Sequence, residues 1–221
     1  MIQCTSCNRA QEPRLICDKC GSPMPVPADF DYFRALGIPR KLVIDNAALE
    51  AAYHELGRKI HPDRFASSAP NLRALSLSGT ALLTRSYRTL RDPIARGLYW
   101  LELQGEKLAE NNKQVPPDLA ATVFEVQEQL ADFRSADGDT SRELRSEIEN
   151  RRGELQSTMD ELQRELERNF SKWDASNITS ANDGADKKAL VPELKTILSK
   201  IAYLRTLLRD IDHCLETIKA A

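Results

Sequence analysis

The stretch from Asp45 to Arg91 constrains the fold most, because a helix breaker separates two amphipathic patterns within it. The first pattern predicts a helix from Asp45 to Ile60, since apolar residues recur at i, i+4, i+7 and i+11 and form one stripe. The stripe consists of Leu49, Tyr53, Leu56 and Ile60. Pro62 cannot continue this helix, because proline has no backbone N–H and disfavours helical geometry in the residue before it. The tripeptide His61-Pro62-Asp63 is therefore expected to form a fixed, exposed corner.

Helical patterns lie on both sides of this corner. A short one runs from Asp31 to Ile38 and is ended by Gly37 and Pro39. A second long helix is predicted from Asn71 to Arg91, and Pro93 to Leu103 is predicted as a further helix with proline in its first turn. The long helix has these apolar residues on its inner side: Leu72, Leu75, Leu83, Tyr87 and Leu90.

This order of elements resembles the J-domain of DnaJ-type co-chaperones. The resemblance covers Phe30 to Leu103. It is carried by three motifs at that family's spacing: Asp31-Tyr32-Phe33-x-x-Leu36-Gly37, His61-Pro62-Asp63-Arg64-Phe65, and Tyr87-x-x-Leu90-x-Asp92-Pro93-x-x-Arg96-x-x-Tyr99. The resemblance implies that His61, Pro62 and Asp63 stimulate ATP hydrolysis by a DnaK-type chaperone ATPase.

A physical reason supports this role. Asp63 on a rigid corner would offer an acceptor-only carboxylate to an arginine of the partner, in a charge-assisted contact. Arg58 and Lys59 make the end of the preceding helix basic, so an acidic surface would be steered toward the corner. Taken alone, the tripeptide is better explained as a simple helix stop, and it is the flanking helices and motifs that favour the functional interpretation.

Two C-x-x-C pairs stand near the N-terminus and use four of the five cysteines: Cys4, Cys7, Cys17 and Cys20. Nine residues separate the pairs, and four thiolates in such turns form the ligand set of structural Zn²⁺. Asn8 and Gly21 follow the pairs and tolerate the positive φ that these turns demand. Two disulfides, an iron site and a redox-active pair are the alternatives, and disulfides require an oxidising compartment. Prolines at 23, 25 and 27 predict an extended linker after the module.

The remainder of the chain predicts an antiparallel bundle of three helices. The first begins at Leu119 and ends before Ala136, the second runs from a cap at Thr140 or Ser141 to Trp173, and the third from Lys187 to Ala220. Residues 104–118, including Asn111 and Asn112, and residues 174–186 are expected to be connections. The expected core residues are Leu119, Val123, Val126, Leu130 and Phe133, then Leu144, Ile148, Leu155, Met159, Leu162, Leu166 and Phe170, then Leu190, Leu194, Ile197, Ile201, Leu204, Leu208, Ile211, Leu215 and Ile218.

Two aromatic residues do not fit these stripes. Phe124 lies about 140° of helical rotation from Leu119, on the side of Glu125, Glu128 and Asp132. Tyr203 similarly falls off the stripe of the last helix. Aromatic side chains on an acidic surface suggest a docking site for a protein with a basic patch, although scattered surface aromatics are also common.

The complete order, a four-cysteine module, a J-domain and a three-helix bundle, resembles the HscB co-chaperones of iron–sulfur cluster assembly in their zinc-containing form. The resemblance implies an HscA-type ATPase and an IscU-like scaffold protein as partners. It places the scaffold-binding face on Phe124, Glu125, Glu128, Asp132 and Tyr203. Ala120 and Ala121 stand where that family usually has bulky leucine and methionine, so about 2 to 4 kcal/mol of apolar contact would be absent.

Composition excludes several other classes. A net charge of −2 and a pI near 6.0 argue against general nucleic-acid binding. No apolar run spans a bilayer and no targeting segment stands out, so we expect a location in the cytoplasm, with the mitochondrial matrix as the alternative. The three histidines and the absence of a phosphate loop or nucleophile elbow predict a protein that is not an enzyme. His213 and Cys214 point about 100° apart on a helix and do not form a nucleophile–base pair.

The sequence therefore predicts an all-α protein with a small N-terminal zinc knuckle. Its expected domains are residues 1–28 for the module and linker, 29–104 for the J-domain with the following helix, and 105–221 for the client-binding bundle. Two other functions remain open. One is a zinc-ribbon adaptor that binds nucleic acid or protein and uses a J-domain to recruit a chaperone ATPase. The other is a general holdase for unfolded chains, which needs a larger exposed apolar groove than the charged helices predict.

Overall fold

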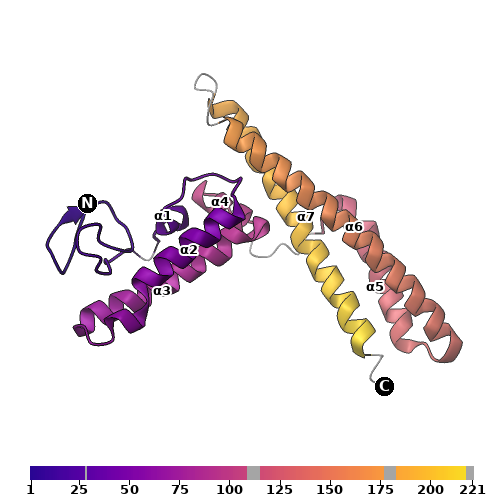
Figure 1. The fold of residues 1–221 in the computed structure, drawn as a ribbon. Helices are drawn as coiled ribbons and strands as arrows, with labels where there is room; N and C mark the ends of the chain where they lie inside the picture. Colours follow the sequence, from indigo (N-terminus) through magenta and orange to yellow (C-terminus); the bar gives the residue numbers. More distant parts are fainter. Residues whose placement is uncertain (28, 109–114, 177–182, 218–221) are drawn as a thin grey trace. The chain divides into compact units, whose positions relative to one another are not determined.

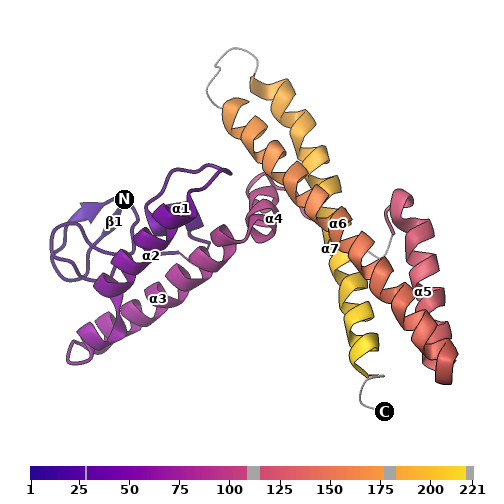
Figure 2. The same ribbon diagram turned by 45° about the vertical axis from the view of Figure 1, so that its right-hand side comes forward.

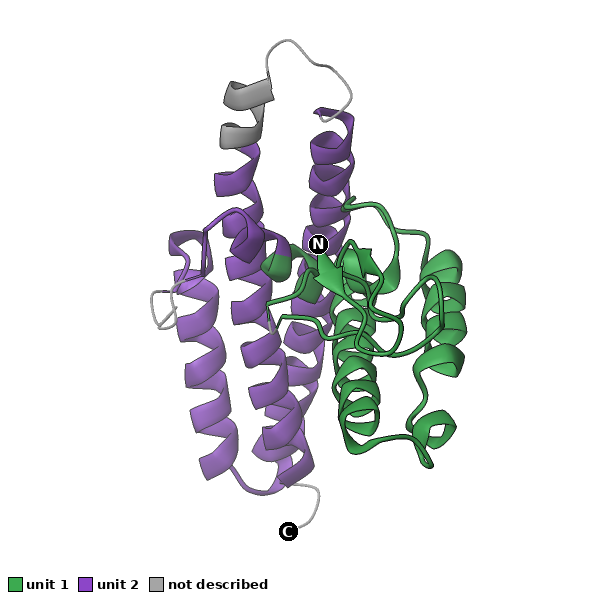
Figure 3. Cartoon of the chain, turned by 90° about the vertical axis from the view of Figure 1, so that its left-hand side faces the viewer, with its two compact units in different colours: residues 1–99 green, residues 100–221 purple. Residues whose placement is uncertain are grey.

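The computed structural model describes residues 1–27, 29–108, 115–176 and 183–217, with the backbone alone for 183–189. The chain divides into two compact units, Met1–Tyr99 and Trp100–Ala221, which Figure 3 distinguishes by colour. Helices dominate both units, and the only described strands are two pairs of residues near the N-terminus. The all-α prediction is confirmed.

A helical hairpin forms the centre of the first unit. It consists of α2 (Asn46–Ile60) and α3 (Pro70–Arg91), which lie side by side in Figures 1 and 2 and are connected through the short 3₁₀ helix η1 (Pro62–Phe65). The short helix α1 (Tyr32–Leu36) packs against both. Asp45 begins α2 by accepting hydrogen bonds from the N–H groups of residues 47 and 48, which helix starts otherwise leave without partners. The buried side chains of this core are Phe33, Leu36, Leu42, Leu49, Ile60, Leu83 and Leu90.

The inner face of α3 differs from the prediction. Leu72 and Leu75 are only half-buried, whereas Ser76, Gly79 and Ser86 are buried. Small residues at this face allow α2 to approach closely: a Cβ atom at Gly79 would lie 2.3 Å from Cδ1 of Ile60. The apolar pattern missed this face because the contact depends on small side chains.

The four-cysteine module folds around its sulfurs. Strands β1 (Ile2–Gln3) and β2 (Ala10–Gln11) pair antiparallel, and Asn8 and Gly21 adopt φ values of 55° and 70°, as the two turns were expected to require. Met24 is buried against Cys4 and Cys17, and its N–H donates to the Leu15 carbonyl at 3.0 Å. The proline-rich segment therefore belongs to the module up to Met24, and only the residues after it can serve as a linker.

The second unit contains the predicted three-helix bundle. Its helices are α5 (Ala120–Ser135), preceded by the short η2 (Pro117–Leu119), α6 (Gly138–Ser176) and α7 (Asp183–Thr217). α6 and α7 are longer than predicted and take up most of the expected connection at 174–186. Residues 177–182, like Asn111, Asn112, Ile218 and Ala220, lie outside the described residues. In Figure 2, α5 runs beside the first half of α6.

The bundle core follows most of the predicted stripes, but Val123, Leu144 and Leu190 are only half-buried, and Leu198, which was not predicted, is fully buried. In α7, Leu207 is buried and Leu208 is half-buried, which is the reverse of the expectation. The next buried position after Leu204 lies three residues further along the helix and not four. Two buried aromatic side chains pack together in this unit. The ring of Trp100 meets that of Trp173, near the C-terminal end of α6, edge to face with centroids 5.6 Å apart. Trp100 belongs to α4 (Pro93–Leu103), the helix in which the boundary between the units falls.

The division into domains at 28 and 104 remains a prediction. Along the chain, the cysteine module and helices α1 to α3 fall within the same compact unit. None of the helices that the structure describes has the length and hydropathy needed to cross a bilayer.

Candidate functional site

The tripeptide His61-Pro62-Asp63 forms the corner between α2 and η1. His61 ends α2 with φ −53° and ψ 132°, and its Nδ1 accepts the backbone N–H of Asp63 at 3.3 Å, so the imidazole caps the new turn. Pro62 then occupies the first position of η1, where a missing N–H costs nothing. The local chemistry of the three residues is thus sufficient to make the bend.

The Asp63 carboxylate projects into solvent. Its side chain is 90% exposed, and its Oδ2 lies 3.5 Å from Nδ1 of His61, whose side chain is 55% exposed. Arg58 and Lys59 are exposed on the last turn of α2, as expected from the sequence. Lys59 donates a hydrogen bond to Glu55 at 2.5 Å, which lowers the pKa of the Glu55 carboxyl group. The corner can therefore present one carboxylate beside a basic helix end.

Three residues of α3 that the sequence analysis did not identify hold the corner in place. The carbonyl of Ile60, immediately before His61, accepts the hydroxyl of Ser76 at 2.5 Å and that of Thr80 at 3.4 Å. The Ile60 side chain has no exposed surface and lies against Gly79. A signal was present in the sequence, since these small residues recur at helical spacing, but only tertiary contact shows what they bind.

The four cysteines converge in one cluster. Their sulfur atoms all lie within 4.8 Å of one another, with 3.6 Å between Cys4 and Cys20 and 3.7 Å between Cys7 and Cys17. A tetrahedral ion with metal–sulfur bonds of about 2.3 Å requires sulfurs about 3.8 Å apart, so the donor set fits such an ion. All four are free thiols in the structure, which does not agree with the disulfide alternative.

The surroundings of the sulfurs shift their pKa values in opposite directions. Hydrogen bonds from the hydroxyl and N–H of Ser22 lower the pKa of the Cys20 thiol to about 6. At Cys7 a backbone hydrogen bond from Arg9 is outweighed by burial and the neighbouring cysteine sulfurs, which raise the pKa of that thiol to about 11. The N–H of Ser6 points to the sulfur of Cys4 at 3.4 Å. Gln11 connects the two halves of the module, because its side-chain amide donates to the Ile16 carbonyl at 3.3 Å and accepts the Asp18 N–H at 3.1 Å. The cluster can hold one metal ion, with Cys4 and Cys17 buried and Cys20 exposed at the surface.

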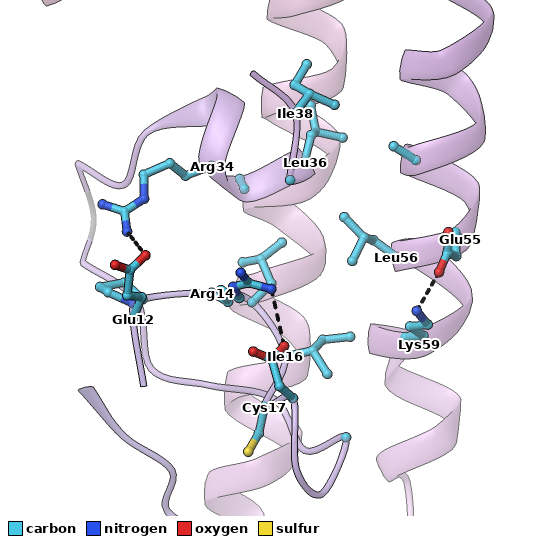
Figure 4. A pocket seen from close by; sticks show the side chains of 17 residues that line it. Glu12, Arg14, Ile16, Cys17, Arg34, Leu36, Ile38, Glu55, Leu56 and Lys59 are labelled. Carbon is cyan, nitrogen blue, oxygen red and sulfur yellow. Dashed lines mark hydrogen bonds and ion pairs between the residues drawn. The ribbon is translucent and has the colours of Figure 1, made fainter. Parts of the chain in front are cut away.

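A surface cleft of about 750 Å³ lies between the cysteine module and helices α1 and α2. Figure 4 shows Ile16 in this cleft together with Leu36, Ile38 and Leu56. Three ion pairs border it: Arg14 with Asp18 at 3.4 Å, Arg34 with Glu12 at 3.3 Å, and Lys59 with Glu55 at 2.5 Å. The charges at its border therefore neutralise one another.

The predicted client residues lie on two helices of the second unit. Phe124 is 70% exposed on α5, and Glu125, Glu128 and Asp132 are exposed on the same helix. Tyr203 lies on α7, which packs against α5, and is half-buried and so less accessible than expected.

One feature of this surface was not predicted. Arg151 of α6 pairs with Glu125 at 3.2 Å and with Glu154 at 2.9 Å, so part of the acidic charge is neutralised within the bundle. Ala120 and Ala121 are exposed at the start of α5. Near the C-terminus, His213 is exposed and Cys214 is buried, in agreement with their expected role as ordinary bundle residues.

Comparison with known proteins gives a consistent result. No family model matches the chain. A protein of Chromobacterium violaceum named "Co-chaperone protein HscB homolog" is 35% identical over 134 residues, which are 58% of this chain and 76% of that protein. The mouse "Iron-sulfur cluster co-chaperone protein HscB" is 30% identical over 138 residues, 60% of this chain and 59% of that protein. The crystal structure of human co-chaperone protein HscB has a TM-score of 0.63 at 23% identity, and the match covers 95% of this chain and 96% of that one.

Proposed function

Because the chain belongs to the HscB family of co-chaperones, we propose that it activates a DnaK/HscA-type ATPase through His61-Pro62-Asp63 and delivers an IscU-like scaffold through its bundle. Its role is that of a co-chaperone in iron–sulfur cluster assembly, and the ATP-hydrolysing site belongs to the partner. The single observation that carries the proposal is the 90% exposed carboxylate of Asp63, on a corner that is fixed by the hydrogen bond from Ser76 to the Ile60 carbonyl.

Activation requires Asp63 to reach a cation of the partner without a large loss of conformational freedom. The carboxylate is an acceptor with two oxygens, so an arginine of the ATPase can bind it in a bidentate, charge-assisted contact. Arg58 and Lys59 attract the acidic surroundings of that arginine and raise the rate of encounter. The contact stabilises the hydrolysis-competent state of the partner by differential binding.

Client binding uses the exposed face of α5. Phe124 supplies the apolar anchor, because a 70% exposed phenyl ring gains more from burial at an interface than any other described side chain of this helix. Glu128 and Asp132 complement a basic patch on the IscU-like scaffold, and Glu125 adds to them although Arg151 neutralises part of its charge. Tyr203 contributes its accessible edge from α7.

We further propose Zn²⁺ as the ion of the cysteine cluster, with Cys4, Cys7, Cys17 and Cys20 as its ligands. The support is the donor set: four sulfurs at tetrahedral spacing and no fifth donor among the described residues of the cluster. When bound, the ion neutralises the thiolate charge and supplies the folding free energy of the module.

The experiment is the substitution Asp63→Ala, assayed by phosphate release from a purified DnaK/HscA-type ATPase at saturating co-chaperone. Stimulation should fall to the unstimulated rate, because the substitution removes the acceptor and, within the fold, only the exposed contact of the carboxylate with Nδ1 of His61. Circular dichroism and binding to the IscU-like scaffold should remain at wild-type values.

Asp29→Ala, at an exposed carboxylate of the same unit, is the matched control and should stimulate normally. Stimulation by Asp63→Ala equal to that of Asp29→Ala would rule out the assigned role of the corner.

A further inference from the structure

The cysteine module and the end of α2 come close to one another at Gly79 of α3. Leu15 lies in the segment between the two C-x-x-C pairs and is 3% exposed. Its Cδ2 atom lies 3.9 Å from the position that a Cβ atom of Gly79 would take, and Cδ1 of Ile60 lies 2.3 Å from the same position. Leu15 of the module and Ile60 of α2 therefore both pack at Gly79, in the middle of α3.

Ile60 determines where the corner starts, because it directly precedes His61. Its side chain has no exposed surface, and its carbonyl, one of those that a helix end leaves without an intrahelical partner, is bound by Ser76 and Thr80. A shift of Ile60 would weaken both hydrogen bonds and displace His61. The orientation of Asp63, two residues further on, follows from that of His61, whose ring accepts the Asp63 N–H.

Leu15 in turn depends on the second half of the module. Its carbonyl accepts the N–H of Met24 at 3.0 Å, and Cys17 stands two residues later, where its own N–H donates to the Ser22 carbonyl at 2.9 Å. Met24 packs on the buried sulfurs of the cluster. A metal ion that holds these cysteines together therefore also fixes the segment from which Leu15 reaches Gly79, the residue against which Ile60 packs.

We propose that Leu15 is a positioning residue for the His61-Pro62-Asp63 corner and that it couples the metal-holding module to activation of the chaperone ATPase. The inference rests on the proposed function of Asp63. It assigns to the module a role beyond folding itself: the filled module holds the end of α2 in the geometry that presents Asp63 to the partner.

The test compares Leu15→Ala with Ile16→Ala in the full-length, zinc-loaded protein. Ile16→Ala is the matched control, because this substitution removes an equally large aliphatic side chain at the neighbouring position. The Ile16 side chain is half-exposed in the cleft (Figure 4). Three quantities are measured: zinc per chain, amide hydrogen exchange at residues 58–66, and the co-chaperone concentration that gives half-maximal ATPase stimulation.

In Leu15→Ala the zinc content should stay at the wild-type value, while exchange at Ile60 and His61 rises about fivefold or more and the half-maximal concentration rises about threefold. Ile16→Ala should leave both unchanged within about a factor of two. Leu15→Met, which nearly conserves volume, should restore wild-type behaviour. Removal of zinc from the wild-type protein with a chelator should raise exchange at the same two amides.

Unchanged exchange at Ile60 and His61 in Leu15→Ala would overturn the inference, even where Asp63→Ala abolishes stimulation and so supports the proposed function. Conversely, an Asp63→Ala variant that still stimulates would refute the proposed function, and the exchange data would still decide whether Leu15 orders the corner. Should Leu15→Ala lose zinc or helix content, Leu15→Val provides the same comparison with a smaller change, and the same two amides decide the outcome.

Discussion

At the scale of single residues, Tyr99 shows how one side chain stabilises the first unit. Its phenolic oxygen accepts the backbone N–H of Tyr32, the first residue of α1, at 3.0 Å, and the two rings stack with centroids 4.2 Å apart. The N–H groups of a first helical turn have no partner within the helix, so this contact replaces one that water would otherwise make. Burial raises the pKa of the Tyr99 phenol to about 12.

The raised pKa predicts a loss of stability at high pH. In the unfolded chain the phenol ionises near pH 10, about two pH units below its pKa in the folded protein, so the folded state binds the proton more tightly. The contribution of Tyr99 to stability is therefore complete below about pH 10 and decreases as the pH rises toward 12.

Tyr99→Phe should remove this pH dependence. It should also cost about 1 kcal/mol at neutral pH, because the Tyr32 N–H loses its acceptor. Thermal unfolding between pH 7 and pH 11.5 measures both effects, with Tyr203→Phe as the control in the other unit. An equal alkaline loss of stability in Tyr99→Phe and the wild type would contradict the assignment.

At the scale of elements, the cysteine module is too small to fold by burial alone. Its strands have two residues each, and its buried side chains are few: Cys4, Gln11, Leu15, Cys17, Pro23 and Met24. Short chains of this kind usually need a metal ion or disulfides to compensate for lost conformational entropy. By contrast, α6 and α7 bury long continuous stripes and need no such help.

Cys17→Ser should therefore reduce bound zinc from one ion per chain to almost none and abolish the exchange protection of residues 2–24. The amides of α6 and α7 should keep their protection, because their stability comes from burial within the bundle. Cys214→Ser, at the buried cysteine of α7, controls for the loss of a thiol and should retain zinc. Metal analysis by mass spectrometry gives the stoichiometry, and iron found in place of zinc would contradict the choice of ion.

At the scale of the whole molecule, the two proposed binding surfaces belong to different compact units. Asp63 lies in the unit Met1–Tyr99, and Phe124, Glu125 and Glu128 lie in the unit Trp100–Ala221. Because each unit has its own core, a substitution on the surface of one should leave the other folded. The two activities are therefore expected to separate genetically.

The double substitution Glu125→Lys, Glu128→Lys should weaken binding of an IscU-like scaffold about tenfold or more, since two attractive charges become repulsive. ATPase stimulation measured without scaffold should remain at the wild-type level. Glu161→Lys, Glu165→Lys, at two exposed positions of α6, has the same change in net charge and should preserve both activities. If the Glu125→Lys, Glu128→Lys variant lost both ATPase stimulation and scaffold binding, that result would argue against two independent surfaces. Glu128→Lys alone removes the complication that Arg151 pairs with Glu125.

Features that depend on residues close together in the sequence were predictable, whereas features that depend on packing between distant residues were not. Helix positions, the corner at Pro62 and the positive φ at Asn8 and Gly21 were predictable because each depends on neighbours within a few residues. The ends of α6 and α7 were not, since polar sequence suggested a connection where the backbone continues as helix. The burial of Leu207 in place of Leu208 was missed for a related reason: a small rotation of α7 decides between two adjacent leucines.

The sequence by itself determined that the chain forms helices, that proline bends it at residue 62 and that four cysteines are spaced to bind a metal, because periodicity and local geometry suffice for each. Only the tertiary structure decided that Leu15, Ile60 and Gly79 meet beneath the corner, that Arg151 neutralises part of the α5 surface and that Tyr203 is half-buried. These contacts join residues distant in the chain, and their partners follow from how whole helices and the cysteine module pack.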